Sequence, residues 1–415
     1  MRPRETLAWI VLALLFIDLT FFSGASNFLA APQSRILNQV LVLGAVVVAG
    51  VVAVRRRSDL RSPLLLPGAA WVAAVAIATL TSQRPAASIE ALALLLLCAP
   101  AYLVVKAVLA DPALRPRIDW LIIVSTTVFV VAYLLQALTQ WASWWSIAGP
   151  SIPPLRPGDV GLTVGTVNAV ALYVELLAPI AVWLSWVRWR SRPFSIGLAV
   201  LAAFALLVTG SRGAWLGTIG GAVVLGVLAW RSGRVSIPRR LRSRGGSVLV
   251  IALGLLGVLL LPALVGRMLS GDAGRVELWS AAWSMFTGSP ITGVGPGAWP
   301  SLRASTPISD DNLAVLATSH NSVLQVLAET GVIGALAAAW LVVAICRLAW
   351  RAVGQAADAN GRVTALVASA SLAAAGLHSV VDMQFHLPAV VLLVLHLVAR
   401  LELVACVDHS RQNPA

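Results

Sequence analysis

The sequence predicts an all-α polytopic membrane protein of about 12 transmembrane helices, with a long outer loop that contains amphipathic helices. Two observations predict this class. Hydrophobic residues make up 59% of the 415 residues, charged residues only 11%, and the mean hydropathy is +0.88. Because soluble globular proteins carry about 25% charged residues, that class is excluded. The apolar residues also form runs of about 20, the length that crosses roughly 30 Å of hydrocarbon as a helix.

Twelve such runs follow one another along the chain. The first has a basic start, as a signal peptide does, but its apolar part is longer than about 15 residues and Asp18 interrupts it, so we expect an uncleaved helix. The spans are predicted near residues 6–24, 36–54, 63–81, 87–109, 118–140, 167–187, 195–210, 213–230, 247–265, 331–350, 363–381 and 387–406.

Basic residues mark the cytoplasmic loops of membrane proteins. With both termini in the cytoplasm, 23 of the 30 basic residues fall on the inner side, which predicts a single membrane domain over residues 1–415 in this orientation. The net charge of +13 therefore gives no reason to expect a nucleic-acid partner. The richest run, at 231–244, suits anionic lipid headgroups, although orientation alone explains it. The arginines on the outer side are Arg35, Arg84, Arg156, Arg212, Arg267, Arg275 and Arg303.

The longest polar interruption lies between spans nine and ten, at residues 266–330, and we expect it to be an outer-face catalytic loop. Loops of this length are usually functional or disordered. Four side chains of this loop are spaced four, four and three residues apart, which puts them on one face of a helix. They are Arg275, Trp279, Trp283 and Phe286. An ordinary interfacial helix explains the aromatic residues, but an arginine at the start of that helix also suits an anion.

Arg212 lies between spans seven and eight on the same side, within TGSRGAWLG. A tight hairpin needs no arginine, and an arginine at the membrane edge costs free energy unless it snorkels or is paired. The alternative to snorkelling is a phosphate clamp, because a guanidinium group binds two phosphate oxygens at once. GVGPGAW at 293–299 lacks the strand and the lysine of a nucleotide-binding motif, so it predicts only a turn.

His320 precedes a second amphipathic helix in TSHNSVLQVLAETG, for which Thr318 or Ser319 is the expected N-cap and Gly331 the expected interruption before span ten. The helix dipole disfavours a cationic histidine at that end, which makes His320 a candidate general base. A buried, hydrogen-bonded histidine is the alternative. Glu329 lies about 180° around the helix, so we do not expect it to pair with His320.

His378 and Asp382 have i, i+4 spacing at the outer end of span eleven, and His386 follows four residues later. Pro388 and the end of the span argue against a three-ligand metal site on one helical face. A hydrogen bond between His378 and Asp382 is expected instead. Glu175 is a carboxylate within a span, where it marks a proton path or is satisfied by nearby polar side chains.

Four motifs, in this order, resemble those of the O-antigen ligase and O-antigen polymerase superfamily of bacterial envelope glycosyltransferases. They are SRGAWLG (211–217), RVELWSAAWSMFTGSPITGVGPGAW (275–299), HNSVLQVLAETGVIG (320–334) and HSVVDMQFHLPA (378–389). The combination is specific, although no single motif is. The first half of the chain resembles the family only in its spans and in GTVNAVALYVELLAPI.

The resemblance implies an inner-membrane enzyme of the GT-C type that transfers a polyprenyl-diphosphate-linked glycan, with inversion, to a glycolipid or glycan acceptor. It implies no metal and no nucleotide cofactor, His320 as the catalytic base, and Arg212 and Arg275 as ligands of the diphosphate. No motif separates a ligase from a polymerase. Contacts to lipid or glycan are expected from Trp279, Trp283, Asn321, His378 and Asp382.

A secondary transporter for a small anion is the alternative from another functional class, because many spans and outer arginines suit one. A transporter predicts charged sites at the bilayer midplane and two related halves. Here the polar candidates gather at one face and the halves are unrelated in sequence, which favours the transferase.

Overall fold

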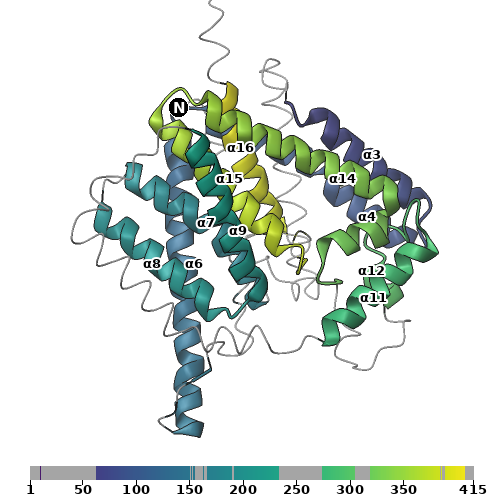
Figure 1. Cartoon of the computed structure of the whole chain (residues 1–415), viewed down its shortest axis with the longest axis horizontal. Helices are drawn as coiled ribbons and strands as arrows, with labels where there is room; N and C mark the ends of the chain where they lie inside the picture. The colour runs from purple at the N-terminus through teal and green to yellow at the C-terminus, as the bar shows by residue number, and fades with distance from the viewer. Residues whose placement is uncertain are drawn as a thin grey trace, which may run out of the picture.

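The structure is a computed structural model that describes residues 62–149, 166–188, 191–232, 273–303, 318–383 and 388–406, with a few single positions between these ranges. This part of the chain is helical throughout and contains no strand (Figure 1). The spans predicted near 6–24, 36–54 and 247–265 lie outside the described residues.

Helices occur at every predicted span within these ranges. The span predicted near 87–109 consists of two helices that meet at Leu97, and α6 and α14 are both longer than predicted. In Figure 1, α6 projects well beyond its neighbours. The helices are α3 (Leu65–Leu80), α4 (Pro85–Leu96), α5 (Cys98–Ala110), α6 (Arg115–Ala148), α7 (Val167–Arg188), α8 (Arg192–Val208), α9 (Arg212–Arg231), α11 (Ala273–Gly288), α12 (Trp299–Arg303), α14 (Ser322–Gln355), α15 (Ala359–His378) and α16 (Pro388–Cys406).

Five helical segments in the described part are long and apolar enough to cross a membrane: α4 with α5, α6, α7, α9 and α14. The apolar helices α3 and α8 are shorter, at 16 and 17 residues. The all-α membrane class is therefore confirmed, whereas the count of about 12 spans stays a prediction.

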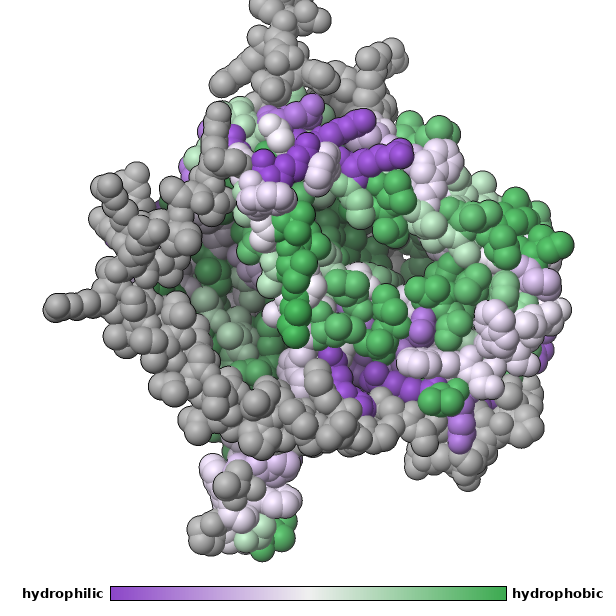
Figure 2. Space-filling view, viewed as in Figure 1, coloured by the Kyte–Doolittle hydropathy of each residue, from purple (hydrophilic) through white to green (hydrophobic). Residues whose placement is uncertain are grey.

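The surface of the bundle is apolar around its middle. Large hydrophobic side chains are exposed along α6, α9 and α14, among them Leu135, Val223 and Leu336. Figure 2 shows apolar residues across the middle of this face and hydrophilic residues gathered near two opposite edges. A band of this kind suits a bundle whose outer side chains face hydrocarbon.

The helix at the centre of the bundle is α7, and its sequence explains why. A helix that is apolar all round is stable when it is surrounded on all sides. Of the 22 residues of α7, 15 are buried, and the helix packs against α6, α8, α9, α15 and α16. This position carries Glu175, the one acidic residue of α7, deep into the bundle, where it is only 2% exposed.

Basic residues that the sequence assigns to inner loops pair with buried carboxylates of α6 and α16. Asp119 of α6 accepts two hydrogen bonds from Arg188, at 2.9 and 2.8 Å, and also pairs with Arg400 of α16. Lys106 of α5 pairs with Glu402 of α16. Removing one partner of such a buried pair leaves an uncompensated charge, so these residues hold α5, α6, α7 and α16 together.

A kink divides α14 at Gly331, where φ is +61° and ψ is −163°. The backbone amides beyond the kink turn to another segment: Val332 donates to the carbonyl of Pro290 at 2.9 Å, and Ile333 donates to that of Ile291 at 3.3 Å. The interruption predicted at Gly331 is confirmed. The kink occurs where the glycine-rich turn after α11, residues 289–298, packs against α14.

Replacing Gly331 with alanine is expected to lower the free energy of unfolding by about 2–4 kcal/mol. A Cβ atom there would lie 2.3 Å from the carbonyl oxygen of Ile291, in a left-handed backbone conformation. The matched control is Gly354→Ala in the same helix, where a Cβ atom meets nothing within 4 Å and alanine favours the helix. Thermal unfolding in detergent measures both variants, and equal midpoints would contradict this account of the kink.

Candidate functional site

The helix ends that carry the predicted site residues meet at one end of the bundle. The helices α9, α11 and α14 begin there, and α15 ends there. The turn that follows α15, residues 379–383, joins them. The carbonyl of Ser379 accepts the backbone amide of Ser322 at 2.9 Å, and the carbonyl of Val381 accepts Nη1 of Arg275 at 2.9 Å. This turn therefore contacts α11 and α14 at once.

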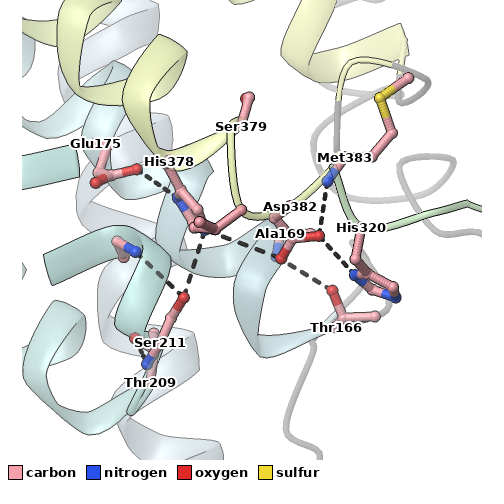
Figure 3. Close-up of polar contacts among 12 residues, drawn as sticks. Thr166, Ala169, Glu175, Thr209, Ser211, His320, His378, Ser379, Asp382 and Met383 are labelled. Atoms are coloured by element: carbon pink, nitrogen blue, oxygen red, sulfur yellow. Dashed lines mark hydrogen bonds and ion pairs between the residues drawn. The ribbon is translucent and has the colours of Figure 1, made fainter. Parts of the chain in front are cut away.

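At the centre of the candidate site, His320 faces Asp382 (Figure 3). Its Nδ1 lies 2.7 Å from Oδ1 of Asp382, which also accepts the backbone amide of Met383 at 2.7 Å. The histidine side chain is 21% exposed and the aspartate side chain 2%. In the tautomer with the proton on Nδ1, the ring donates to the carboxylate and Nε2 can accept a proton. The pair has the geometry of a general base held by a buried acid.

Asp382 makes no hydrogen bond with His378, so the expectation from the sequence is wrong. Nε2 of His378 and Oδ2 of Asp382 are 4.0 Å apart, too far for a hydrogen bond. Residues at i and i+4 lie side by side only in a continuous helix, but α15 ends at His378 and the chain then turns. Asp382 is thereby carried away from the face of α15 and towards His320.

His320 has a left-handed backbone, with φ of +51°, and stands before the helix rather than in its first turn. The N-cap of α14 is Asn321, whose side-chain oxygen accepts a first-turn amide at 3.0 Å. The expectation that Thr318 or Ser319 caps the helix is therefore wrong. The His320 ring contacts the Asp382 carboxylate, and Asn321 caps the helix.

Asp382 is ionised because of its partners. Burial would raise the pKa of its carboxyl group, but the hydrogen bond with His320 and the charges of His320 and His378 outweigh burial and lower the pKa to about 2. An aspartate that stays charged at every physiological pH can hold a histidine in one orientation and stabilise its protonated form.

The same pKa shift predicts how stability depends on pH. Because the pKa of Asp382 is depressed in the folded state, its contribution of about 2 kcal/mol is present above about pH 5 and is lost as the pH falls towards 2. We expect the thermal midpoint of the wild type to fall over this range, and that of Asp382→Asn to start lower and fall less. Asp358→Asn, which keeps an N-cap side chain, is the control and should follow the wild type. Parallel falls in wild type and Asp382→Asn would contradict the assignment.

His378 pairs with Glu175 of α7 instead of with Asp382. Nδ1 of His378 lies 2.8 Å from Oε2 of Glu175, and Thr218 donates to the other carboxylate oxygen at 3.3 Å. Nε2 of His378 is 3.4 Å from the hydroxyl of Ser211. The start of α9 can come this close because Gly213 has no side chain, since a Cβ atom there would lie 2.5 Å from the His378 ring. Glu175 is thus satisfied from α15 and α9, not from its own helix.

Both predicted diphosphate ligands belong to this end of the bundle. Arg275 donates to the carbonyl of Val381, the residue directly before Asp382. Arg212 is the first residue of α9, directly after the N-cap Ser211, whose hydroxyl contacts His378. The two arginines thus belong to helix starts at the same end of the bundle, although they are more than 60 residues apart in the sequence.

The aromatic side chains of α11 do not share one environment. Trp279 is half-buried, whereas Trp283 is 53% exposed and its ring centroid lies 5.3 Å from that of Phe286. The buried face of α11 carries Leu278 and Ala282 instead. At 100° per residue the aromatic residues are centred roughly 100° around the helix from that buried face. Trp283 is therefore exposed.

A second polar chain, not predicted from the sequence, fixes the backbone beside His320. Glu329 accepts hydrogen bonds from Nε2 of Gln325 at 2.9 Å and from the backbone amide of Trp299 at 3.3 Å. Oε1 of Gln325 in turn accepts the amide of Ser319 at 2.8 Å. Glu329 does not pair with His320, as expected. Through Gln325 it instead connects the backbone of Trp299 with that of Ser319, the residue directly before His320. The i, i+4 spacing of Gln325 and Glu329 was the available signal.

Some predicted residues cannot be placed. His386 and Arg267 lie outside the described residues, as does the stretch 304–317 of the predicted catalytic loop. Arg303, another outer arginine, is fully buried at the end of α12. Within the described ranges, no three His, Cys, Asp or Glu side chains come together in a group that could hold a metal ion.

One part of the chain that contributes to this site matches a known family. Residues 197–339 match the family model described as O-Antigen ligase, a stretch that includes Arg212, Arg275 and His320. No curated protein sequence matches the chain. Residues 197–339 therefore contain an O-antigen ligase domain, which together with the four motifs is consistent with a member of the O-antigen ligase and O-antigen polymerase superfamily.

Proposed function

We propose that this protein is an inverting membrane glycosyltransferase that moves a glycan from a polyprenyl diphosphate to a hydroxyl group of an acceptor. The observation that carries the proposal is the His320–Asp382 pair at 2.7 Å, one residue from the carbonyl that binds Arg275. A base held by a buried acid, beside cationic side chains, is what attack by a hydroxyl and departure of a diphosphate require.

In the proposed reaction, the acceptor oxygen attacks the anomeric carbon of the donor sugar while Nε2 of His320 takes the hydroxyl proton. Asp382 keeps the proton on Nδ1 and stabilises the imidazolium that forms. The bond from the anomeric carbon to the diphosphate oxygen breaks on the opposite face of the sugar, which inverts the anomeric configuration. The bonding pair leaves with the diphosphate.

The leaving diphosphate gains negative charge, and Arg212 and Arg275 are proposed to compensate it. Guanidinium groups bind phosphate oxygens through two parallel N–H donors. Their positions at the starts of α9 and α11 add the positive end of each helix dipole. Trp283 and Phe286, on the outer side of α11, are proposed to lie beside the polyprenyl chain.

The orientation and the acceptor belong to the same proposal. The distribution of basic residues supports cytoplasmic termini and a site on the periplasmic face of the inner membrane. We propose a glycolipid acceptor, as in a ligase of lipopolysaccharide biosynthesis. A polymerase, whose acceptor is a second lipid-linked glycan, uses the same base and the same arginines.

The test is transfer by the purified protein in proteoliposomes, from a polyprenyl-diphosphate oligosaccharide to candidate acceptors, with EDTA present. We expect a product that forms without a divalent metal ion, and the acceptor that works separates a ligase from a polymerase. Product formation that needs added metal would contradict the proposed role of the two arginines. Absence of transfer with every donor and acceptor would overturn the transferase and favour anion transport.

A further inference from the structure

A cavity lies at the end of the bundle opposite to His320. The helix α9 runs about 30 Å from Arg212 to Arg231, and the cavity is found at its far end, where α14 ends and α15 begins. Its volume is about 420 Å³. The lining residues include Arg231, Ser232, Val353, Gly354, Gln355 and Arg362.

The chemistry of this lining suits an anion. Two guanidinium groups and an amide supply hydrogen-bond donors, and none of the described lining residues is acidic. The guanidinium carbon of Arg231 lies 3.2 Å from the ring centroid of Trp350. Stacking on a ring holds the guanidinium plane while its N–H groups remain available to an acceptor.

The position of Arg362 also indicates an anion. Arg231 ends α9, where a cation is stabilised by the helix dipole, so this residue needs no ligand. Arg362 lies in the first turn of α15, where the dipole disfavours a cation. The acid before it, Asp358, is engaged as the N-cap and accepts the amide of Gly361 at 2.6 Å. An anion between the two arginines would offset the unfavourable placement of Arg362.

The surroundings of the cavity place that anion at a membrane surface. Trp230, beside Arg231, is 84% exposed, and Trp350 is 47% exposed. Exposed tryptophans are enriched at the level of lipid headgroups. Further along α9 into the apolar band, Val227 and Val223 are exposed about one and two turns from Arg231. A bound phosphate would therefore lie where acyl chains can follow the surface of α9.

We propose that this cavity binds the headgroup of an anionic phospholipid, with Arg231 and Arg362 as ligands of its phosphate. Basic pockets between membrane helices recognise such headgroups. The bound lipid joins the ends of α9, α14 and α15, the three helices whose opposite ends bear Arg212, His320 and His378. It therefore stabilises the packing that sets the candidate site. The proposal does not depend on the transfer reaction.

The test is binding of phosphatidylglycerol to the full-length protein in neutral detergent, measured by native mass spectrometry and by the rise in thermal midpoint. We expect the double variant Arg231→Gln/Arg362→Gln to bind about 30-fold more weakly, because each basic residue near an anionic surface contributes about a fivefold effect. Gly354→Leu, which fills the cavity without changing charge, is expected to weaken binding as well. Its Cβ atom meets nothing within 4 Å, so folding should be kept.

The matched control is Arg347→Gln/Arg351→Gln, which removes the same charge from exposed positions of α14 that do not line the cavity. Equal weakening in the control would overturn the site in favour of general surface electrostatics. Phosphatidylcholine and glycerol 3-phosphate are the comparison ligands. Equal stabilisation by phosphatidylcholine would overturn the need for an anion, and equal stabilisation by glycerol 3-phosphate would replace the lipid with a soluble phosphate.

Discussion

Replacing His320 with asparagine is expected to lower the rate of transfer by about 10²- to 10⁴-fold while the protein stays folded. Asparagine tolerates the left-handed backbone of His320, with φ of +51°, better than most residues do. Its amide can also donate to Asp382, so that the buried carboxylate keeps a partner. The variant thus loses the base and keeps the contacts. Initial rates in proteoliposomes measure the loss, and the thermal midpoint checks the fold.

The matched control for this variant is Val323→Ala, which shortens an exposed side chain in the first turn of α14. It should transfer at the wild-type rate. Wild-type rates in the asparagine variant would exclude His320 as the base. A loss of activity accompanied by a large fall in the thermal midpoint would instead assign His320 to folding.

Replacing Arg275 with glutamine is expected to lower the maximal rate by about 10²- to 10³-fold, the usual effect of removing one preorganised group that stabilises transition-state charge. Arg275→Lys should retain part of the rate, because a lysine keeps the charge but loses the paired donors. The rate should fall more than the apparent affinity for the donor, since the charge develops as the diphosphate leaves. Rates over a range of donor concentrations measure both.

Arg84→Gln is the matched control for charge. Arg84 is another arginine predicted on the outer side, and it is exposed at the start of α4. Its loss should leave transfer unchanged. Equal losses in the Arg84 and Arg275 variants would show that overall surface charge attracts the donor, and the assignment of Arg275 to the diphosphate would fail.

The helices could be predicted from the sequence because each depends mainly on its own composition. A run of about 20 apolar residues forms a helix in lipid whatever its neighbours are, since no water is present to satisfy the backbone. The position of the break at Gly331 could also be predicted, because a glycine follows an amphipathic helix there, although the segment that packs against the break could not. The ends of the helices were predicted less well. The helix α6 continues to Ala148, through a polar and tryptophan-rich stretch that follows the apolar run.

The pairing of polar side chains was predicted poorly. Spacing along one helix suggested a bond between His378 and Asp382, but the helix ends between them and each residue pairs elsewhere. The partners, Glu175 and His320, are 203 and 62 residues away in the sequence. The spacing of residues within one helix cannot predict contacts between residues so far apart in the sequence.

The sequence by itself determined the membrane class, the helices in the described ranges, and the set of motifs from Arg212 to Asp382 that resembles the O-antigen ligase family. Composition and local spacing fix these, because each is a property of a short segment. Only the tertiary structure decided which acid holds His320 and which one holds His378. That choice depends on the close approach of α9 at Gly213 and on the turn after α15, and both exist only once α7, α9, α14 and α15 are packed together.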